Sequence, residues 1–297
     1  MDKKISAILK EGEIRLTKSG NNRAAEESIL LLSYLLNKSR FNILFNRSLS
    51  LSPKDIQTYY DWIDSRSKGM PLQYITGFQN FMGLEFKVEK GIFIPRPETE
   101  ILVEKIINII SLMPDKVELC FLDVGTGSGI IPVTICNHFQ NSRKNIHFYA
   151  VDISAKAIIL ATENAHRLKC AEKITFCHGN MFDCIKNLNR EILFDGIISN
   201  PPYIPREELD NLPDEIYYHE PVKALDGGEK GLDYYQEIIS KTPQFLKQEK
   251  SFLAFEIGHN QQKDISEMIK KSGFFKEYLS VIQDYYHNDR VILAYTK

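Results

Sequence analysis

Apolar side chains in the first 70 residues recur with the spacing of amphipathic helices. Two helical faces stand out, one formed by the apolar positions 25, 29, 32 and 36 and the other by Ile56, Tyr59, Tyr60 and Ile63. The second helix has a start signal, because Ser52 can cap its first turn, with Pro53 at the first helical position and Asp55 three residues after the cap. Short polar loops at 38–39 and 46–53 then predict a small antiparallel helical bundle.

The pattern changes after residue 72. The stretch from Gln73 to Phe93 is rich in β-branched and aromatic residues and is interrupted by glycines at 77, 83 and 91. This composition favours a β-hairpin that joins two domains. We therefore predict an N-terminal helical domain over residues 1–72, a hairpin linker over 73–96 and a second domain over 97–297.

From Pro97 onward, short apolar runs alternate with helical patterns. We predict strands at 118–124, 146–151, 173–177, 193–199, 251–257, 274–282 and 290–296. We predict helices at 98–111, 129–139, 154–168, 232–247 and 260–272. The apolar strand runs suit a sheet covered on both faces, so an α/β fold with a mainly parallel sheet is expected. Such sheets bind ligands at the edge where the strand-to-helix turns gather.

The composition excludes several classes of protein. With 43% hydrophobic and 26% charged residues among 297, the chain is neither disordered nor collagen-like. Its net charge is −2, and residues 1–95 hold 14 Lys and Arg against 10 Asp and Glu, which leaves the remainder acidic. Because duplex-binding proteins usually carry a broad basic field, we expect no stable nucleic-acid partner.

The sequence also argues against a membrane or exported protein. No apolar run approaches the roughly 20 residues that span a bilayer, and the start lacks the pattern of a secretory or transit peptide. The 5 cysteines include no C-x-x-C pair and the 7 histidines have no ligand spacing, so no metal site is expected. We expect a reduced, cytoplasmic protein without a membrane partner.

A glycine-rich turn is the first candidate for chemistry. Residues 120–131 read CFLDVGTGSGII, so a predicted strand ends at Asp123 and a predicted helix begins after Gly129. Glycines at 125, 127 and 129 let the backbone approach a ligand, and the helix start supplies free N–H groups, although a bare tight turn would also explain them. The spacing differs from the dinucleotide fingerprint G-x-G-x-x-G, and Asp123 suits an amino-acid ammonium group better than a pyrophosphate.

The next predicted strand, HFYAVD, ends at Asp152, with Ser154 as the cap of the following helix. A carboxylate in this place can accept both hydroxyls of a ribose, unless it is simply a solvated strand end. With the glycine turn and Asp123 it outlines a nucleoside with a cationic amino-acid tail. This arrangement resembles the Rossmann-like class I fold of S-adenosylmethionine (SAM) methyltransferases. In that fold the positions of Asn180 and Met181 contact adenine, where the family more often has Asp and an apolar residue.

The predicted strand 193–199 runs into Asn200, Pro201, Pro202 and Tyr203. A rigid turn that ends a strand explains the prolines but not the residues beside them. An amide or aromatic amine nitrogen is a poor nucleophile, because its lone pair is delocalised. The side-chain oxygen of Asn200 and the carbonyl of Pro201 can accept its two N–H groups, while Tyr203 packs on the planar group. Alignment with a cationic methyl donor then does most of the catalysis, and no general base is required.

The motif [DNS]-P-P-[YFW] is shared by adenine-N6 methyltransferases of DNA and RNA and by enzymes that methylate glutamine. Other segments separate them: PLQYITG at 71–77, IFIPRPETE at 92–100, HEPVKALDGGEKGLDYY at 219–235 and EIGHNQ at 256–261. Across essentially the whole chain, these segments resemble the release factor glutamine methyltransferase family (PrmC/HemK). The resemblance implies methyl transfer from SAM to N5 of the glutamine in the Gly-Gly-Gln motif of peptide chain release factors, with S-adenosylhomocysteine as product. Adenine-N6 methylation of nucleic acid is the alternative.

The resemblance also implies roles for single residues. The expected cofactor contacts are Asp123, Gly125, Thr126, Gly127, Ser128, Gly129, Asp152, Asn180, Met181 and Asn200. The residues Asn200, Pro201, Pro202 and Tyr203 are expected to form the substrate loop, with Asn200, Pro201 and Tyr203 as the catalytic groups. Phe93 and residues 96–100, Arg96 and Glu98 among them, are expected to wall the site, and the helical domain is expected to help grip the release factor. We expect a monomer.

Some neighbouring segments have two interpretations. Residues 95–98 could be only an interdomain elbow, and residues 226–228 form either a plain turn or an active-site lid. Glu220 either braces that lid or is a solvated carboxylate, and Glu256 and His259 are expected to be structural. A third class, a SAM-binding protein without catalysis, is hard to reconcile with the intact N-P-P-Y motif.

Overall fold

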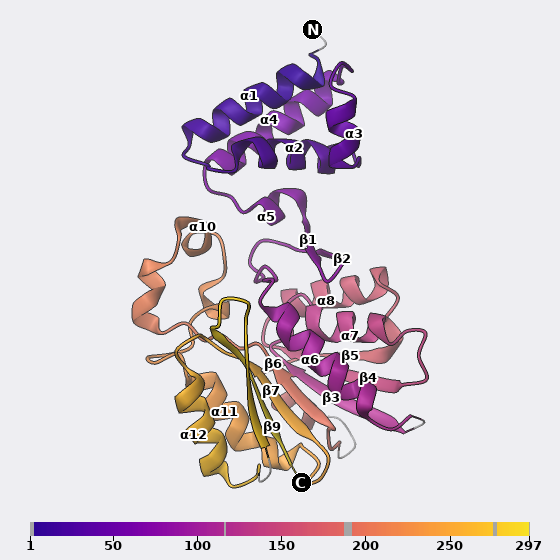
Figure 1. Cartoon of the computed structure of the whole chain (residues 1–297), viewed down its shortest axis with the longest axis vertical. Helices are drawn as coiled ribbons and strands as arrows, with labels where there is room; N and C mark the ends of the chain where they lie inside the picture. The colour runs from indigo at the N-terminus through magenta and orange to yellow at the C-terminus, as the bar shows by residue number, and fades with distance from the viewer. Residues whose placement is uncertain (1–2, 116, 187–191, 276–277, 297) are drawn as a thin grey trace. The chain divides into compact units, whose positions relative to one another are not determined.

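The computed structural model describes residues 3–115, 117–186, 192–275 and 278–296 (Figure 1). The chain divides into two compact units. The helical unit comprises Met1–Phe78 together with Pro213–His219, and the sheet unit comprises Gln79–Leu212 and Glu220–Lys297. The boundaries predicted from the sequence at 72 and 96 remain predictions.

The helical unit is built from short helices packed around one apolar core. Its helices are α1 (Ile5–Lys18), α2 (Ala24–Leu35), α3 (Arg40–Phe45), α4 (Pro53–Ser67), α5 (Leu72–Thr76) and α10 (Asp214–Tyr217). The predicted start of α4 is confirmed, because the Ser52 hydroxyl accepts the N–H of Asp55 at 3.1 Å and Pro53 begins the helix. The predicted face of α4 is largely buried, with Tyr59 and Ile63 fully inaccessible.

Three of the four positions predicted for the buried face of α2 are confirmed, because Leu32 is fully buried and Ile29 and Leu36 pack against the core. Ala25 is exposed, whereas the buried residues of this helix include Glu27 and Ser28. Both polar side chains are satisfied inside the core: Glu27 pairs with Arg66 at 2.6 Å, and the Ser28 and Tyr59 hydroxyls lie 2.6 Å apart. A count of apolar positions cannot detect a face that is buried through ion pairs and hydrogen bonds.

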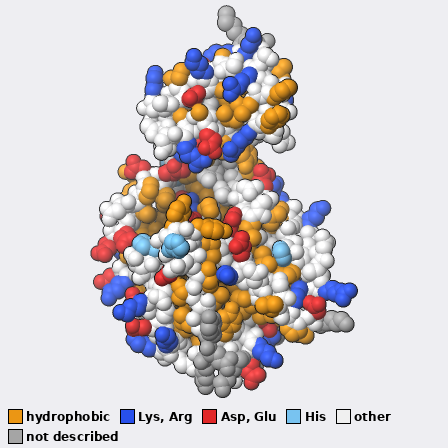
Figure 2. Space-filling model, viewed as in Figure 1, with side chains coloured by type: hydrophobic (Ala, Val, Ile, Leu, Met, Phe, Trp, Pro, Cys, Tyr) orange, Lys and Arg blue, Asp and Glu red, His pale blue; other side chains and the backbone are white. Residues whose placement is uncertain are grey.

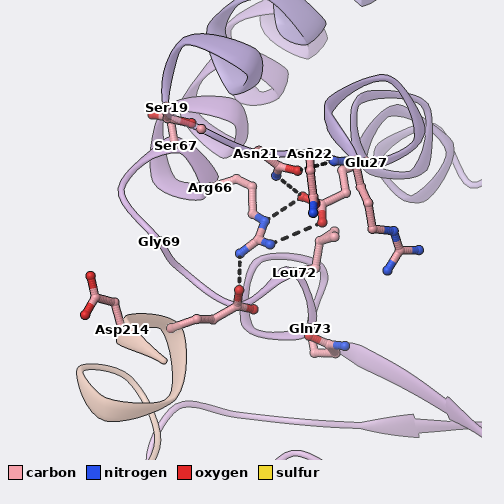
Figure 3. A pocket seen from close by; sticks show the side chains of 13 residues that line it. Ser19, Asn21, Asn22, Glu27, Arg66, Ser67, Gly69, Leu72, Gln73 and Asp214 are labelled. Carbon is pink, nitrogen blue, oxygen red and sulfur yellow. Dashed lines mark hydrogen bonds and ion pairs between the residues drawn. The ribbon is translucent and has the colours of Figure 1, made fainter. Parts of the chain in front are cut away.

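A pocket of about 510 Å³ opens in the helical unit beside this ion pair (Figure 3). The Arg66 guanidinium contacts both oxygens of Glu27, and its Nη1 lies 3.0 Å from Glu215. Asn21 donates a further hydrogen bond to Glu27 at 2.6 Å. The central charges of this pocket are therefore already matched within the protein.

The hairpin predicted over 73–93 is shorter than expected. Residues Leu72–Thr76 form the helix α5, which begins after Pro71 and ends at Gly77, whose φ of +80° is a left-handed cap. The strands β1 (Phe78–Phe81) and β2 (Leu84–Lys87) follow as a separate two-stranded sheet. Met82 and Gly83 both have positive φ, as a two-residue hairpin turn requires.

In the described part of the chain, the large sheet of the sheet unit has seven strands in the order β5-β4-β3-β6-β7-β9-β8 (Figure 1). The strands are β3 (Glu118–Val124), β4 (Asn145–Asp152), β5 (Ile174–His178), β6 (Gly196–Ser199), β7 (Phe252–Glu256), β8 (Tyr278–Gln283) and β9 (Asp289–Tyr295). The first five run parallel, and β9 is antiparallel to both β7 and β8. This confirms the predicted α/β class with a mainly parallel sheet.

Helices cover both faces of this sheet (Figure 1). The helices α6 (Thr99–Leu112), α7 (Ile130–His138) and α8 (Ala155–Arg167) share one core with Phe121 and Phe148, and α11 (Asp233–Lys241) and α12 (Gln262–Ser272) share another with Leu122 and Leu253. Alternate residues of β3 enter opposite cores, as expected for a strand buried on both faces. Short elements complete the unit: α9 (Asp183–Lys186) and 3₁₀ turns at Ala171–Lys173, Arg206–Asn211, Val222–Ala224 and Thr242–Gln244.

Most predicted boundaries agree with the structure within two residues, and three differ by more. The helix predicted over 232–247 ends at Lys241, because Pro243 cannot continue the α-helical hydrogen bonds and a 3₁₀ turn follows. The strand predicted from 193 begins at Gly196, because Phe194 instead pairs with the loop at Phe245 and Lys247. The strand predicted over 274–282 is seen from Tyr278, and residues 276–277 lie outside the described residues. Among the described helices, none combines the length and apolar character needed to cross a membrane.

Candidate functional site

Three predicted site residues leave adjacent strands at one edge of the sheet. Asp123 lies at the carboxyl end of β3, Asp152 ends β4, and Asn200 directly follows β6. The chain runs from β3 outward through β4 to β5 and then returns to the other side of β3 at β6. Such a topological switch point is where open α/β sheets bind ligands.

The glycine turn has the backbone that its sequence predicts. Gly125, Gly127 and Gly129 have φ values of +77°, +55° and +81°, which other residues adopt only at a cost. The amides of Gly125 and Thr126 donate to the carbonyl of Val151 at 2.8 and 3.0 Å, so the turn is tied to the end of β4. A Cβ on Gly129 would meet Ala161 at 3.0 Å, so this glycine also permits close packing of α7 and α8.

Asp123 is a buried carboxyl group without a partner. Its exposure is 0%, and in the described part of the chain neither of its oxygens has a hydrogen-bond partner. Burial raises its pKa to about 7, while the nearby Thr126 hydroxyl opposes the rise and the charge of Asp152 adds to it. An unpaired buried carboxylate is costly, and a cationic ligand group would compensate it. This orphaned group therefore fits the ammonium of an amino-acid tail.

Asp152 holds the glycine turn as well as its own helix. One carboxylate oxygen accepts the N–H of Gly127 at 2.9 Å, and the other accepts the N–H of Ser154 at 2.8 Å. Burial raises the pKa of this carboxyl group, and the two backbone hydrogen bonds oppose the rise. Because a carboxylate offers about four acceptor positions, it retains capacity for two hydroxyl groups. Ser154 caps α8 as predicted, accepting the N–H of Ala157 at 3.2 Å.

Asn180 and Met181 follow β5, the strand next to β4. Gly179 donates to the carbonyl of Asp152 at 3.0 Å, which brings this turn beside the second acid. Asn180 is exposed, whereas Met181 is buried among the apolar side chains beneath the sheet. The φ of Met181 is +43°, a left-handed value that is uncommon for this residue type and often marks a functional turn.

The Asn-Pro-Pro-Tyr segment is held by contacts on both sides. Nδ2 of Asn200 donates to the Thr99 hydroxyl at 3.1 Å, and the carbonyl of Tyr203 accepts from Gln261 at 2.9 Å. Pro201 is buried. Burial raises the pKa of the Tyr203 hydroxyl, with the charge of Glu256 adding to the effect, so this phenol stays neutral.

The glycine-rich segment 226–231 packs directly on this loop. Ile204 and Asp226 form a parallel bridge, with Gly227 donating to the Ile204 carbonyl at 2.9 Å. A Cβ on Gly227 would lie 2.8 Å from the Cα of Tyr203, and a Cβ on Gly231 would lie 2.2 Å from the backbone carbonyl oxygen of Tyr203. The glycines are therefore needed for close approach of two backbones.

Glu220 has a role that neither sequence interpretation anticipated. It is 5% exposed, accepts the N–H of Ile94 at 3.3 Å and forms an ion pair with Arg96. The Arg96 guanidinium in turn lies 4.9 Å from the ring centre of Phe93. Glu220 therefore braces the predicted wall of the site rather than the glycine-rich segment. Glu98, by contrast, is exposed.

The structure adds Gln261 to the predicted site, and it gives Thr99, which lies in the range 96–100 expected to wall the site, a hydrogen bond with Asn200. Thr99 is fully buried at the start of α6, and Glu256, which was expected to be structural, is 1% exposed at the end of β7. Burial raises the pKa of Glu256 to about 7, and the nearby side chains of Thr99, Arg290 and Asn200 oppose the rise. Glu256 and Gln261 lie in the EIGHNQ segment, a run of polar residues after a buried strand that could have signalled a site. His259 is exposed.

The visible face in Figure 2 carries charged side chains of both signs. Figure 2 shows Lys and Arg side chains interspersed with Asp and Glu side chains on each unit, without a broad patch of one sign. Among the described residues, no group of three or more His, Cys, Asp or Glu side chains is arranged to hold a metal ion.

Comparisons with known proteins agree with this arrangement. Residues 7–77 match the PrmC N-terminal domain, and residues 115–283 match a methyltransferase domain. The chain is 38% identical to the release factor glutamine methyltransferase of Clostridium acetobutylicum, over 91% of this chain and 90% of that protein. It is 33% identical to the protein of the same name from Bacillus cereus, over 98% and 99% of the two chains. The solved hMettl16 catalytic domain, in complex with the MAT2A 3'UTR hairpin 6, matches with a TM-score of 0.57 at 14% identity, over 90% and 92% of the chains, which shows the shared fold.

Proposed function

The chain belongs to the release factor glutamine methyltransferase family, and from this premise we propose that it methylates a release factor. The reaction would transfer a methyl group from SAM to the N5 side-chain nitrogen of the glutamine in the Gly-Gly-Gln motif of a peptide chain release factor. S-adenosylhomocysteine would be the second product. The family relationship over nearly the full chain favours this activity over adenine-N6 methylation of nucleic acid.

The residues at the ends of β3 and β4 would hold SAM. Asp123 would face its ammonium group, which supplies the positive charge that the buried carboxylate lacks. Asp152 would accept the ribose hydroxyls, and the turn from Gly125 to Gly129 would lie against the amino-acid tail. The Asn180 side chain would accept a hydrogen bond from adenine or donate one to it, and Met181 would pack against the adenine ring. When bound, SAM supplies an activated methyl group on a cationic sulfur.

The Asn-Pro-Pro-Tyr loop would hold the methyl acceptor. The side-chain oxygen of Asn200 and the carbonyl of Pro201 would each accept one N–H of the glutamine amide, and Tyr203 would pack on its plane. These contacts orient the nitrogen lone pair and exclude water, which lowers the barrier mainly through positioning. Pro202 keeps the loop rigid. No residue has to act as a general base before the transfer, because the N–H proton becomes acidic only as the new bond forms.

One observation supports this assignment most strongly. In the ladder between β3 and β6, Asp123 pairs with Ile198 and Val124 with Ser199, and the Ser199 hydroxyl donates to the Val124 carbonyl at 2.6 Å. The proposed SAM-binding turn and the proposed acceptor loop therefore leave neighbouring strands in fixed register. A donor and an acceptor held there would be oriented by the sheet itself.

The release factor would meet further surfaces. Phe93 and Arg96, braced by Glu220, would wall the glutamine site, with Glu98 at its exposed rim. The helical unit would contribute to recognition of the release factor. We propose that the enzyme acts as a monomer in the cytoplasm and binds neither membrane nor nucleic acid stably.

Intact-mass spectrometry tests the activity and the site together. A bacterial release factor is incubated with the protein and SAM, beside a variant in which the glutamine of its Gly-Gly-Gln motif is replaced by alanine. We expect a gain of one methyl group on the first and none on the second. Transfer to the alanine variant would overturn the assigned position. No transfer to either, with SAM still bound, would overturn the assigned substrate and direct the search to adenine-containing nucleic acid.

A further inference from the structure

A buried carboxyl group lies next to the loop proposed to hold the acceptor. β6 and β7 are parallel neighbours, and Ser199 pairs with Phe255 in their ladder. The next residue of each strand is Asn200 on one side and Glu256 on the other. The register of the sheet therefore brings the carboxylate of Glu256 to the amide of Asn200, although the two lie 56 residues apart in sequence.

Thr99 links these two side chains. Its hydroxyl accepts a hydrogen bond from Nδ2 of Asn200 at 3.1 Å, and the side chains of Thr99 and Asn200 both lie close enough to the carboxylate of Glu256 to lower its pKa. One oxygen of Glu256, Oε2, has no partner among the described residues. Thr99 is 0% and Glu256 1% exposed, so water does not compete for these contacts.

The hydrogen-bonding capacities of these groups fix one direction. An ionised carboxylate only accepts, so the Thr99 hydroxyl, whose oxygen accepts from Asn200, is free to turn its single proton toward Glu256. Two acceptors thus surround the NH₂ end of the Asn200 amide, and its oxygen is left for another donor. An amide turned the other way would point its own N–H groups at the acceptor N–H that its oxygen should receive, which is repulsive.

We propose that Glu256 and Thr99 are positioning residues that set the orientation of the Asn200 amide, so that its oxygen receives the N–H of the methyl acceptor. This inference rests on the proposed function, because it assumes that Asn200 binds the glutamine amide. Neither residue touches the reacting atoms. Both act by selecting one of two nearly isosteric orientations of the Asn200 side chain.

The charge state of Glu256 makes this arrangement sensitive to pH. Burial raises its pKa to about 7, helped by the charge of Glu98 before α6 and opposed by Thr99, Arg290 of β9 and Asn200. The remaining groups near it are the hydroxyls of Tyr203 and of Tyr235 in α11, which donates to the Glu256 backbone carbonyl at 2.9 Å. Protonated Glu256 can donate a proton, and the preference for one amide orientation is lost. The rate at saturating substrates should therefore rise with pH through about 7.

Paired substitutions at Thr99 test the proposal. Thr99→Val keeps the shape and removes the hydroxyl, Thr99→Ser restores the hydroxyl, and Glu256→Gln keeps an acceptor but adds a donor. Methylation of the release factor is followed from pH 6 to 8.5 at saturating SAM and release factor, and the dissociation constant of SAM is measured for every variant. Saturation with SAM keeps Asp123, which also titrates near pH 7, paired in every assay.

The expected result is a selective loss of kcat. For the wild type, kcat should rise by about tenfold from pH 6 to 8, as one ionisation near 7 requires. Thr99→Val and Glu256→Gln should lower kcat at pH 8 by roughly 10- to 100-fold and flatten the pH profile, with SAM affinity unchanged. Thr99→Ser should recover most of the lost rate.

Two results would overturn the inference while the proposed function stands. The first is that Thr99→Val keeps the kcat and the pH profile of the wild type. The second is that Thr99→Ser and Thr99→Val lower kcat by the same factor. If the wild type itself fails to methylate the release factor, the proposed function fails, and this inference falls with it. If Glu256→Gln does not fold, the Thr99 pair alone decides the question.

Discussion

Replacing Asp123 with Asn should stabilise the ligand-free protein at alkaline pH and weaken its binding of SAM. Burial of this carboxyl group raises its pKa from 3.8 to about 7, so the folded state holds the proton more tightly than the unfolded chain. The resulting contribution to stability is fully present below pH 3.8 and is lost as the pH rises through about 7. At pH 8 the native protein therefore contains an uncompensated buried charge.

The size of the effect follows from the shift in pKa. A shift of about 3 units corresponds to about 4 kcal/mol at 1.36 kcal/mol per unit, and about 3 kcal/mol of this falls between pH 5 and pH 8. The Asp123→Asn variant has no proton to lose at this position. The free energy of unfolding of the variant, relative to the wild type, should therefore rise by about 3 kcal/mol over that range. Hydrogen exchange of the β3 and β4 amides measures it directly, because these strands lie in the core of the sheet unit.

The same variant should bind SAM roughly 100-fold more weakly at pH 8, since loss of a buried charge pair costs about 3 kcal/mol. Trp62, the single tryptophan, lies in α4, so its fluorescence follows the helical unit and provides the control. The urea midpoint measured by Trp62 fluorescence should be the same in the variant and the wild type. The reasoning is refuted if the free energies of unfolding of variant and wild type differ by a constant amount from pH 5 to 8, because Asp123 then does not change its protonation on folding.

Three further substitutions test other parts of the structure. Glu27→Gln leaves the largely buried Arg66 guanidinium without its main partner and should lower the free energy of unfolding of the helical unit by about 3 kcal/mol. Urea denaturation followed by Trp62 fluorescence measures this loss. A loss below about 1 kcal/mol would mean that the ion pair is solvated. Asp152→Ala should raise the dissociation constant of SAM roughly 30-fold in calorimetric titration, because hydrogen bonds of charged groups contribute about 2 kcal/mol. An unchanged dissociation constant would remove Asp152 from the cofactor site. Gly227→Ala forces a Cβ to within 2.9 Å of the acceptor loop and should lower kcat roughly 100-fold with SAM affinity intact, whereas wild-type kcat would show that the loop position is not critical.

Much of the sheet unit could be predicted from the sequence, because its local signals agree with its tertiary packing. The strand Glu118–Val124 and the glycines after it follow from short-range requirements, namely an apolar run and positive φ values. The order of strands and helices is equally local. Boundaries failed where one residue overrode the pattern, as Pro243 did in ending α11.

The partners of the catalytic loop could not be predicted, because they come from distant parts of the chain. Thr99 opens a helix about 100 residues before Asn200, and Glu256 ends a strand more than 50 residues after it. The sheet register alone brings Glu256 to the loop. Similarly, a search for apolar faces could not place Glu27 in the core, because its burial depends on Arg66 from another helix.

The central claim is that Asn200 holds the acceptor nitrogen while other residues hold SAM. Single-turnover methyl transfer to the release factor, started from preformed SAM complexes of wild type and Asn200→Ala, tests it most directly. The account predicts that the variant transfers at least roughly 100-fold more slowly, while its dissociation constant for SAM stays within about twofold. An undiminished rate, or a loss of rate fully explained by an equal loss of SAM affinity, would contradict the role assigned to Asn200.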